Sequence, residues 1–184
     1  MALTYTPQGE IGSEMISFQL PATDGKIYSN EYFNTAKGAL VMFICNHCPY
    51  VQAIEDRLVQ LGKDFISLNI KVLAISSNDA NHTPEDSFEK MKERAQTKAY
   101  SFPYLYDETQ NVAKSFGAVC TPDFFLFNSN KKLVYRGRLD DSWKDPAQVN
   151  TRELYLAGLT LSKDQPLNFE AKSSMGCSIK WKEN

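Results

Sequence analysis

The hydrophobic residues of this chain fall into short continuous runs and longer stretches with a helical period. Residues 39–44, Ala-Leu-Val-Met-Phe-Ile, form a continuous apolar run that ends at Cys45. A run of this length is typical of a strand in a parallel sheet that is covered on both faces. Residues 72–75, Val-Leu-Ala-Ile, form a second such run. We therefore expect two buried strands here.

A helical period separates these two runs. From Val51 to Phe65, apolar residues recur at spacings of three and four, and charged residues lie between them. This period predicts one amphipathic helix that starts at about Pro49. Strand, helix and strand then make a right-handed βαβ unit, with Cys45 at its first turn.

The rest of the chain predicts further short elements. Thr83-Pro84-Glu85-Asp86 supplies an N-cap, a first-turn proline and acidic residues for a second helix. The remaining expected elements are an N-terminal hairpin over 17–28, a short helix between Asp107 and Gly117, a hairpin formed by 123–127 and 133–135, and a final helix over about 151–161.

This order of elements predicts an α/β fold with a mixed central sheet flanked by helices and an N-terminal β-hairpin extension. The chain has 184 residues, 42% of them hydrophobic, which is enough for one core. We expect residues 1–165 to form a single domain. Residues 166–184 are weakly patterned, and we interpret them as a C-terminal tail that carries Cys177.

The charge pattern excludes some classes of partner. There are 20 basic and 22 acidic residues spread along the chain, for a formal net charge of −2. No strong field gathers nucleic acid or an anionic membrane, so we expect neither as a partner. No segment has the pattern of a signal peptide or a membrane span, and a cytoplasmic location is the default expectation.

The motif Cys45-Asn46-His47-Cys48 carries the clearest chemistry. A cysteine attacks as a thiolate, and a helix N-terminus lowers the pKa of its thiol. We expect the Cys45 sulfur to face the unpaired N–H groups of the first turn and to act as the nucleophile, with Cys48 as the resolving thiol. His47 would stabilise a thiolate, which makes the corresponding disulfide more oxidising.

Other interpretations of this pair are an inert buried pair and half of a zinc site. A closed zinc site needs four ligands, usually two such pairs, and the chain has one CxxC pair. Redox chemistry is favoured by the position at a strand-to-helix junction. We expect no metal and no cofactor.

The segment Cys120-Thr121-Pro122 precedes a predicted buried strand. A cis peptide bond before Pro122 could hold backbone groups against a dithiol, because cis bonds are essentially confined to X-Pro. The residues alone favour an ordinary trans proline at the start of a strand.

Together these motifs resemble the thioredoxin superfamily over roughly residues 13–161, in particular the redoxins related to AhpC/TSA and to ResA/TlpA-type thiol oxidoreductases. More narrowly, four segments are similar to a thioredoxin-like family of bacterial proteins. These are Phe43–Val51 (FICNHCPYV), Cys120–Asp123, Tyr135–Arg138 and Gly176–Trp181.

The resemblance implies a thioredoxin fold and a thiol–disulfide oxidoreductase. It implies that Cys45 attacks, that Cys48 resolves, and that Pro122 is a cis-proline whose preceding backbone binds the extended chain of a substrate. We expect Thr121, Cys120 and Asn46 to line that substrate site. The partners implied are a disulfide-bearing protein or small thiol and a reductant such as the thioredoxin or glutathione system.

The chain departs from thioredoxins in two respects. It has Ile44 where thioredoxins have Trp, and it lacks the buried Asp of the preceding strand, so His47 is the nearest substitute for a proton acceptor. The peroxiredoxin motif Pro-x-x-x-Thr-x-x-Cys, aligned on Cys48, places Cys45 at the threonine and Val41 at the proline. Because neither position matches this motif, a peroxiredoxin-like thiol peroxidase is the weaker, alternative function.

Two further cysteines have open roles. Cys120 could be a third redox thiol, a ligand in a metal or iron–sulfur site with Cys45 and Cys48, or a small residue used in packing. Cys177 could pair with any of these thiols. Four cysteines allow three full pairings, and the sequence does not choose among them.

Overall fold

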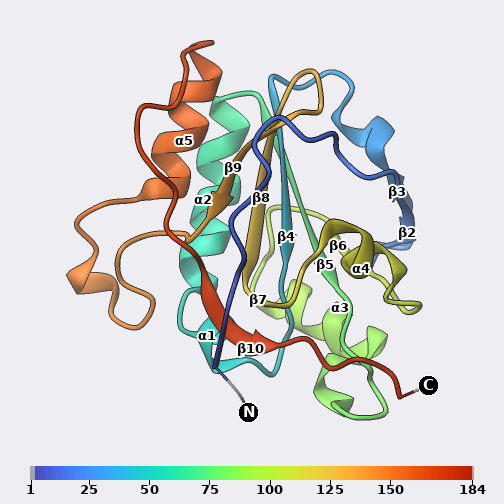
Figure 1. The fold of residues 1–184 in the computed structure, drawn as a ribbon. Helices are drawn as coiled ribbons and strands as arrows, with labels where there is room; N and C mark the ends of the chain where they lie inside the picture. The colour runs from blue at the N-terminus through green and yellow to red at the C-terminus, as the bar shows by residue number, and fades with distance from the viewer. Residues whose placement is uncertain (1–2, 184) are drawn as a thin grey trace.

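The structure, a computed structural model, describes residues 3–183, and a five-stranded sheet lies at its centre (Figure 1). Its strand order is β6-β5-β4-β8-β9, with β4 parallel to β5 and antiparallel to β8. The sheet is therefore mixed, as expected. The strands are β4 Gly38–Phe43, β5 Ile70–Ser76, β6 Tyr104–Tyr106, β8 Asp123–Asn128 and β9 Leu133–Gly137.

The described residues also form five α-helices and three short 3-10 helices. The α-helices are α1 Pro49–Gln52, α2 Glu55–Ser67, α3 Phe88–Thr97, α4 Asn111–Phe116 and α5 Glu153–Ser162. The 3-10 helices are η1 Asn30–Phe33, η2 Pro84–Asp86 and η3 Pro146–Gln148.

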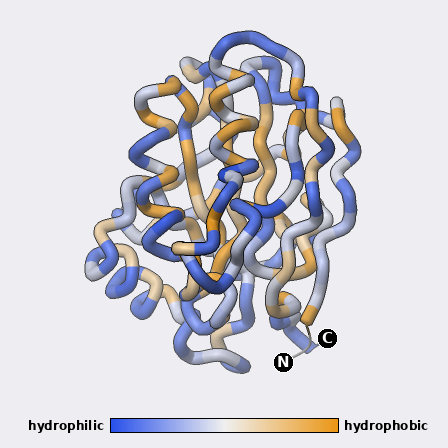
Figure 2. The backbone as a smooth tube through the Cα atoms, turned by 90° about the vertical axis from the view of Figure 1, so that its left-hand side faces the viewer, coloured by the Kyte–Doolittle hydropathy of each residue, from blue (hydrophilic) through white to orange (hydrophobic). Residues whose placement is uncertain are grey.

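The two faces of the central sheet are covered by different elements. Side chains alternate along β4, so Leu40 and Met42 pack with α2, α3 and α5, whereas Val41 and Phe43 pack with α4, η1 and the N-terminal hairpin. That hairpin is formed by β2 Gln19–Pro21 and β3 Ile27–Ser29. Figure 2 shows hydrophobic residues concentrated in the central strands, while most connecting loops are hydrophilic.

Two helix predictions need correction. The helix expected from Pro49 is two helices, because α1 ends where the Ile54 N–H bonds the Val51 carbonyl oxygen at 3.1 Å, a tighter closure than an α-helical turn. The helix expected at Thr83 begins after Ser87, and the intervening residues form η2. The carboxylate of Asp86 instead accepts hydrogen bonds from the backbone of Asn46 and His47, as described below.

The weakly patterned tail contains a strand that the sequence did not predict. Residues Met175–Ser178 form β10, which pairs antiparallel with β1 Leu3–Tyr5 on one side and with β7 Cys120–Thr121 on the other. This three-stranded sheet places a strand from near each end of the chain side by side, and β10 lies beside α1 (Figure 1). In the part of the chain that is described, no helix combines the length and apolar character needed to cross a bilayer.

Candidate active site

The motif Cys45-Asn46-His47-Cys48 connects the end of β4 to the start of α1. The N-cap of α1 is Cys48, and Pro49 occupies the first helical position, where a missing N–H costs nothing. The expectation that Cys45 holds the first-turn position is therefore wrong, because the chain continues past β4 for five residues before the helix begins. Cys48, and not Cys45, is the residue at the start of this helix.

The segment preceding Pro122 lies directly against both thiols. The Thr121–Pro122 peptide bond is cis, as the family resemblance implied. The sulfur of Cys45 lies 3.1 Å from the Thr121 hydroxyl oxygen. The Cys48 thiol donates a hydrogen bond to the Thr121 carbonyl oxygen at 3.3 Å. Thr121 thus contacts the two cysteines with different groups and fixes their separation.

The environment of Cys48 favours its thiolate. A hydrogen bond from Cys45 lowers the pKa of Cys48 to about 5, aided by hydrogen bonds from the Cys177 side chain and from the backbone of Val51 and Cys177, and opposed by burial. Burial raises the pKa of Cys45 well above its ordinary range, and the Thr121 hydroxyl opposes this rise. Of the two thiols, Cys48 is therefore the one that loses its proton more readily.

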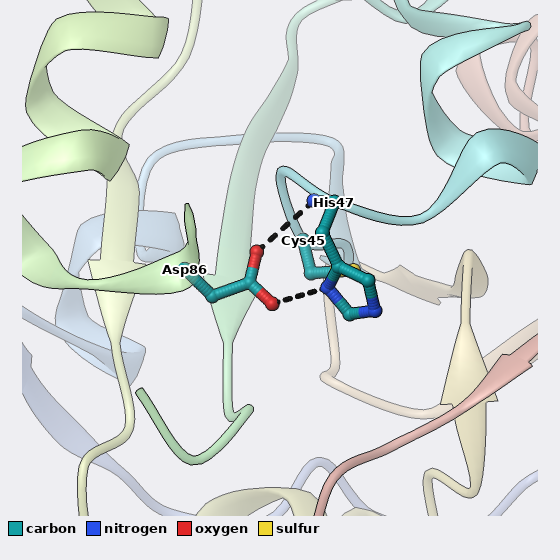
Figure 3. Close-up of side chains that lie close together, drawn as sticks. All are labelled: Cys45, His47 and Asp86. Carbon is teal, nitrogen blue, oxygen red and sulfur yellow. Dashed lines mark hydrogen bonds and ion pairs between the residues drawn. The ribbon is translucent and has the colours of Figure 1, made fainter. Parts of the chain in front are cut away.

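His47 is held by a buried carboxylate that the sequence did not indicate. Nδ1 of His47 donates a hydrogen bond to Oδ2 of Asp86 at 2.5 Å (Figure 3). The same carboxylate accepts the backbone N–H groups of Asn46 at 2.7 Å and His47 at 3.1 Å, and the Asn78 amide at 2.8 Å. Asp86 has no solvent exposure, so these bonds are its only compensation for burial among the described residues.

The directions of their two pKa shifts indicate that His47 and Asp86 form an ion pair. Burial disfavours the charged form of Asp86, but the hydrogen bonds from His47 and Asn78 outweigh it and lower the pKa of this carboxyl. The hydrogen bond to Asp86 raises the pKa of His47. Its Nε2 is buried and has no hydrogen-bond partner among the described residues. The site therefore favours the positive form of the imidazole beside the thiols, and this form stabilises a thiolate.

Three donors of this site lie close enough to bind a metal ion. Ligand atoms of Cys45, His47 and Asp86 lie within 4.8 Å of one another, and no other such cluster occurs among residues 3–183. The alternative metal set of Cys45, Cys48 and Cys120 does not form such a cluster among the described residues. A tetrahedral site would need a fourth ligand, and Nδ1 of His47 already donates to Asp86. The arrangement fits thiolate stabilisation better than metal binding.

The two additional cysteines differ in their relation to the motif. Cys120 is buried, and this burial raises the pKa of its thiol to about 12. Cys177 lies opposite Thr121 in the β7–β10 pair, and its side chain hydrogen-bonds Cys48. Cys177 therefore contacts the dithiol, which the sequence could not establish.

Two cavities lie near the motif. One, of about 500 Å³, is lined by Asn46 and His47 together with charged residues of η2 and α3. The other, of about 150 Å³, is lined by Pro122 and by an aromatic pair. The rings of that pair, Tyr50 and Trp143, lie 4.5 Å apart. Neither cavity includes Cys45, which is 2% exposed, or Cys48, which is fully buried.

Comparison with known proteins decides the family. The sequence model of the AhpC/TSA family matches residues 11–136. The chain belongs to the AhpC/TSA family. This membership confirms the thioredoxin-like redoxin group and indicates oxidoreductase chemistry. A search of curated proteins found none that matches this chain.

Solved structures show how far the similarity of this AhpC/TSA protein extends. An uncharacterized conserved protein from Geobacillus kaustophilus is 41% identical, with a TM-score of 0.95 over 100% of this chain and 98% of that chain. A hypothetical protein from Sinorhizobium meliloti is 34% identical, with a TM-score of 0.92 over 98% and 100%. The match to both includes the C-terminal tail.

A more distant structure supports the fold alone. Peroxidoxin BcpB from Mycobacterium tuberculosis is 17% identical, with a TM-score of 0.62 over 83% of this chain and 96% of that chain. With the sheet order described above, this similarity confirms the thioredoxin fold expected from the sequence.

Proposed function

We propose that this AhpC/TSA protein is a thiol–disulfide oxidoreductase that acts through a Cys45–Cys48 dithiol/disulfide. The observation that carries the proposal is the packing of both sulfurs against Thr121, at 3.1 Å and 3.3 Å, with a hydrogen bond between the two thiols. Two thiols held this close can form a short disulfide with little movement of the backbone.

In the proposed reaction, Cys45 passes its proton to the Cys48 thiolate and attacks one sulfur of a substrate disulfide. The second substrate sulfur leaves as a thiol or thiolate, and a mixed disulfide forms on Cys45. Cys48 then loses its proton, which its lowered pKa favours, and attacks the Cys45 sulfur. The remaining substrate thiolate leaves with that proton, and the Cys45–Cys48 disulfide is returned to the dithiol by an external reductant, such as the thioredoxin or glutathione system.

The neighbouring residues have supporting roles in this proposal. The Thr121 hydroxyl donates to the Cys45 thiolate during attack, and the positive charge on His47 stabilises a thiolate on Cys48. Asn46 positions the loop, since its side-chain amide donates to the Glu85 carbonyl oxygen at 2.8 Å. The contacts of Thr121 and His47 stabilise a thiolate, and so the reduced form more than the disulfide, which would make the centre comparatively oxidising.

Access to the site places a condition on the substrate. Cys45 is only 2% exposed, and the backbone edge of Thr121 is already paired with Cys177. A protein disulfide can therefore react after the segment over Thr121 has moved, and the aromatic cavity beside Pro122 offers a neighbouring contact surface. The cytoplasmic location expected from the sequence stays a prediction.

Insulin reduction tests this function with a matched pair of variants. We expect both Cys45→Ser and Cys48→Ser to lose turnover, and Cys48→Ser to accumulate a mixed disulfide on Cys45 that mass spectrometry detects. The Cys45→Ser variant should accumulate much less mixed disulfide. Turnover equal to that of the wild type in both variants would exclude the proposal, provided that near-UV circular dichroism shows both to be folded.

A thiol peroxidase is a second candidate, favoured by the lowered pKa of Cys48 and its place at the first turn of α1. Peroxide is small enough to reach a buried thiol that a protein disulfide cannot. In that reaction Cys48 would become a sulfenic acid, and Cys45 would condense with it to release water. Peroxide consumption in the presence of a dithiol, with dimedone trapping on Cys48 in the Cys45→Ser variant, separates this function from the first.

A further inference from the structure

Strand β10 lies unusually close to the segment that contacts the dithiol. Cys177 is the register partner of Thr121, and Ser178 is the partner of Cys120. At Gly176, an added Cβ would lie 1.8 Å from the Thr121 carbonyl oxygen. Because no other side chain fits at this distance, Gly176 permits an approach that brings the following residue, Cys177, to the redox site.

The chain is fastened on both sides of Cys177. Before it, the Ser174 hydroxyl donates to the Pro122 carbonyl oxygen at 2.8 Å. After it, the Ile179 N–H donates to the Val119 carbonyl oxygen at 3.0 Å, and the Lys180 N–H donates to the Asn78 side chain at 2.8 Å. Cys177 therefore has a defined position, although it comes from the weakly patterned tail.

That position makes Cys48 the middle member of three thiols. Cys48 lies 3.3 Å from the carbonyl oxygen of Thr121, the residue that Cys177 faces across the strand pair. Hydrogen bonds join the Cys48 sulfur to both Cys45 and Cys177. Cys120 is adjacent to Thr121 in the same strand, but Ser178 rather than Cys177 is its register partner.

We infer that Cys177 is a third thiol of the redox centre and exchanges with the Cys45–Cys48 disulfide to form a Cys48–Cys177 disulfide. This inference rests on the proposed dithiol function. It assigns to the tail a chemical role in the same centre.

The exchange is balanced without any external reagent. The Cys177 thiolate attacks the Cys48 sulfur, the Cys48–Cys177 bond forms, and the Cys45–Cys48 bond breaks. Cys45 leaves as a thiolate and takes up the proton that Cys177 has lost. One disulfide replaces another, so no net oxidation occurs. The products are a reduced Cys45 and a covalent link between β10 and the start of α1.

Trypsin fragments make the two disulfides distinguishable. Cleavage after Lys and Arg places Cys45 and Cys48 together in residues 38–57, Cys177 in residues 173–180, and Cys120 in residues 115–131. The experiment oxidises the full chain with oxidised glutathione, quenches with acid, alkylates the remaining thiols and analyses the digest by mass spectrometry. A link between 38–57 and 173–180 reports the disulfide of Cys177.

Variants assign the link to one cysteine. In the wild type we expect the link between 38–57 and 173–180 beside the internal Cys45–Cys48 disulfide. The link should be retained in Cys45→Ser and should fall at least tenfold in Cys48→Ser. The matched control Cys120→Ser should retain it. Circular dichroism of each variant establishes that it is folded.

The possible failures are separable. If the wild type forms the internal Cys45–Cys48 disulfide while Cys177 remains fully alkylated, the inference is wrong and the proposed function stands. The inference also fails if 173–180 links to 115–131 as readily as to 38–57. If no internal Cys45–Cys48 disulfide forms under any oxidising condition, the proposed function fails first.

Discussion

Nδ1 of His47 lies 2.5 Å from Oδ2 of Asp86, a carboxylate that is 39 residues away in sequence and fully buried in the fold. This contact explains how a histidine inside the CxxC motif can carry positive charge in a largely buried site. It also links η2 to the loop that presents both thiols, because the same carboxylate accepts two backbone N–H groups of that loop.

Replacing Asp86 should change the titration of His47. In Asp86→Asn, the charged partner that raises the pKa of His47 is gone, so we expect this pKa to fall toward or below its ordinary value of about 6.5. Nuclear magnetic resonance of the imidazole protons against pH measures it directly. The neighbouring Glu85→Gln variant, which leaves the backbone contact to Asn46 intact, should not change it. An unchanged titration in Asp86→Asn would contradict the ion pair.

The same pair makes stability depend on pH in a defined direction. The pKa of Asp86 is lowered in the folded protein. Its contribution to the free energy of unfolding is therefore complete above about pH 4 and is lost as the pH falls through this lowered pKa. The folded pKa of His47 is raised, so its contribution is complete below about pH 6.5 and is lost as the pH rises. The pair stabilises most between these limits.

Urea unfolding of wild type and Asp86→Asn tests this dependence. We expect the variant to be less stable by about 2 kcal/mol at pH 5.5, because charge-assisted hydrogen bonds to a buried carboxylate are lost. The difference in unfolding free energy should shrink at pH 8. Subtracting the two proteins removes groups that titrate alike in both. A difference that grows toward pH 8 would have the wrong sign for this pair.

The Thr121 hydroxyl should affect the reactivity of Cys45. Thr121→Val removes the oxygen that lies 3.1 Å from the Cys45 sulfur and keeps the shape of the side chain. A hydrogen bond worth about 1 kcal/mol corresponds to roughly a fivefold slower attack by the Cys45 thiolate on a small disulfide. Thr121→Ser, which retains the hydroxyl, is the matched control and should react at nearly the wild-type rate. Equal rates in all three proteins would exclude this role.

The thiolate on Cys48 can be observed without chemical access to the site. Thiolate absorbance at 240 nm should rise with a midpoint near the pKa of about 5, well below the ordinary value of about 8.5. Cys45→Ala removes the hydrogen bond that lowers the pKa of Cys48 most, so the midpoint should move upward by at least one pH unit. A wild-type midpoint above pH 8 would contradict the proposed charge distribution.

The sequence predicted the elements whose signals are local. The apolar run of β4, the β8–β9 hairpin and the end of α4 at Gly117 all depend on neighbours along the chain. The family resemblance added the cis bond before Pro122. These features were sufficient to identify the thioredoxin fold and the position of the CxxC motif.

Long-range pairing explains what the sequence did not predict. Asp86 looked like a first-turn acid of a helix, yet it bonds a loop 40 residues earlier, and no local pattern distinguishes the two uses. Strand β10 is stabilised by its partners β1 and β7 rather than by its own alternation. Cys177 therefore became a neighbour of Cys48 only in the folded chain.

Displacing β10 should uncover the dithiol. In Gly176→Ala, the new methyl group would collide with the Thr121 backbone, so we expect the strand to shift and the thiols of Cys45 and Cys48 to react at least tenfold faster with a neutral maleimide. Ser178→Ala in the same strand is the control and should react as the wild type does. Protection in Gly176→Ala equal to that of the wild type would show that β10 does not cover the site.

The most direct test of the central claim is equilibration of the protein with glutathione redox buffers, followed by acid quenching and mass mapping of the thiols. The account predicts a reversible two-electron transition in which Cys45 and Cys48 oxidise together, at a potential less negative than the roughly −270 mV of thioredoxin, because the environment stabilises the thiolate. A protein in which no Cys45–Cys48 disulfide forms anywhere in the series would contradict it.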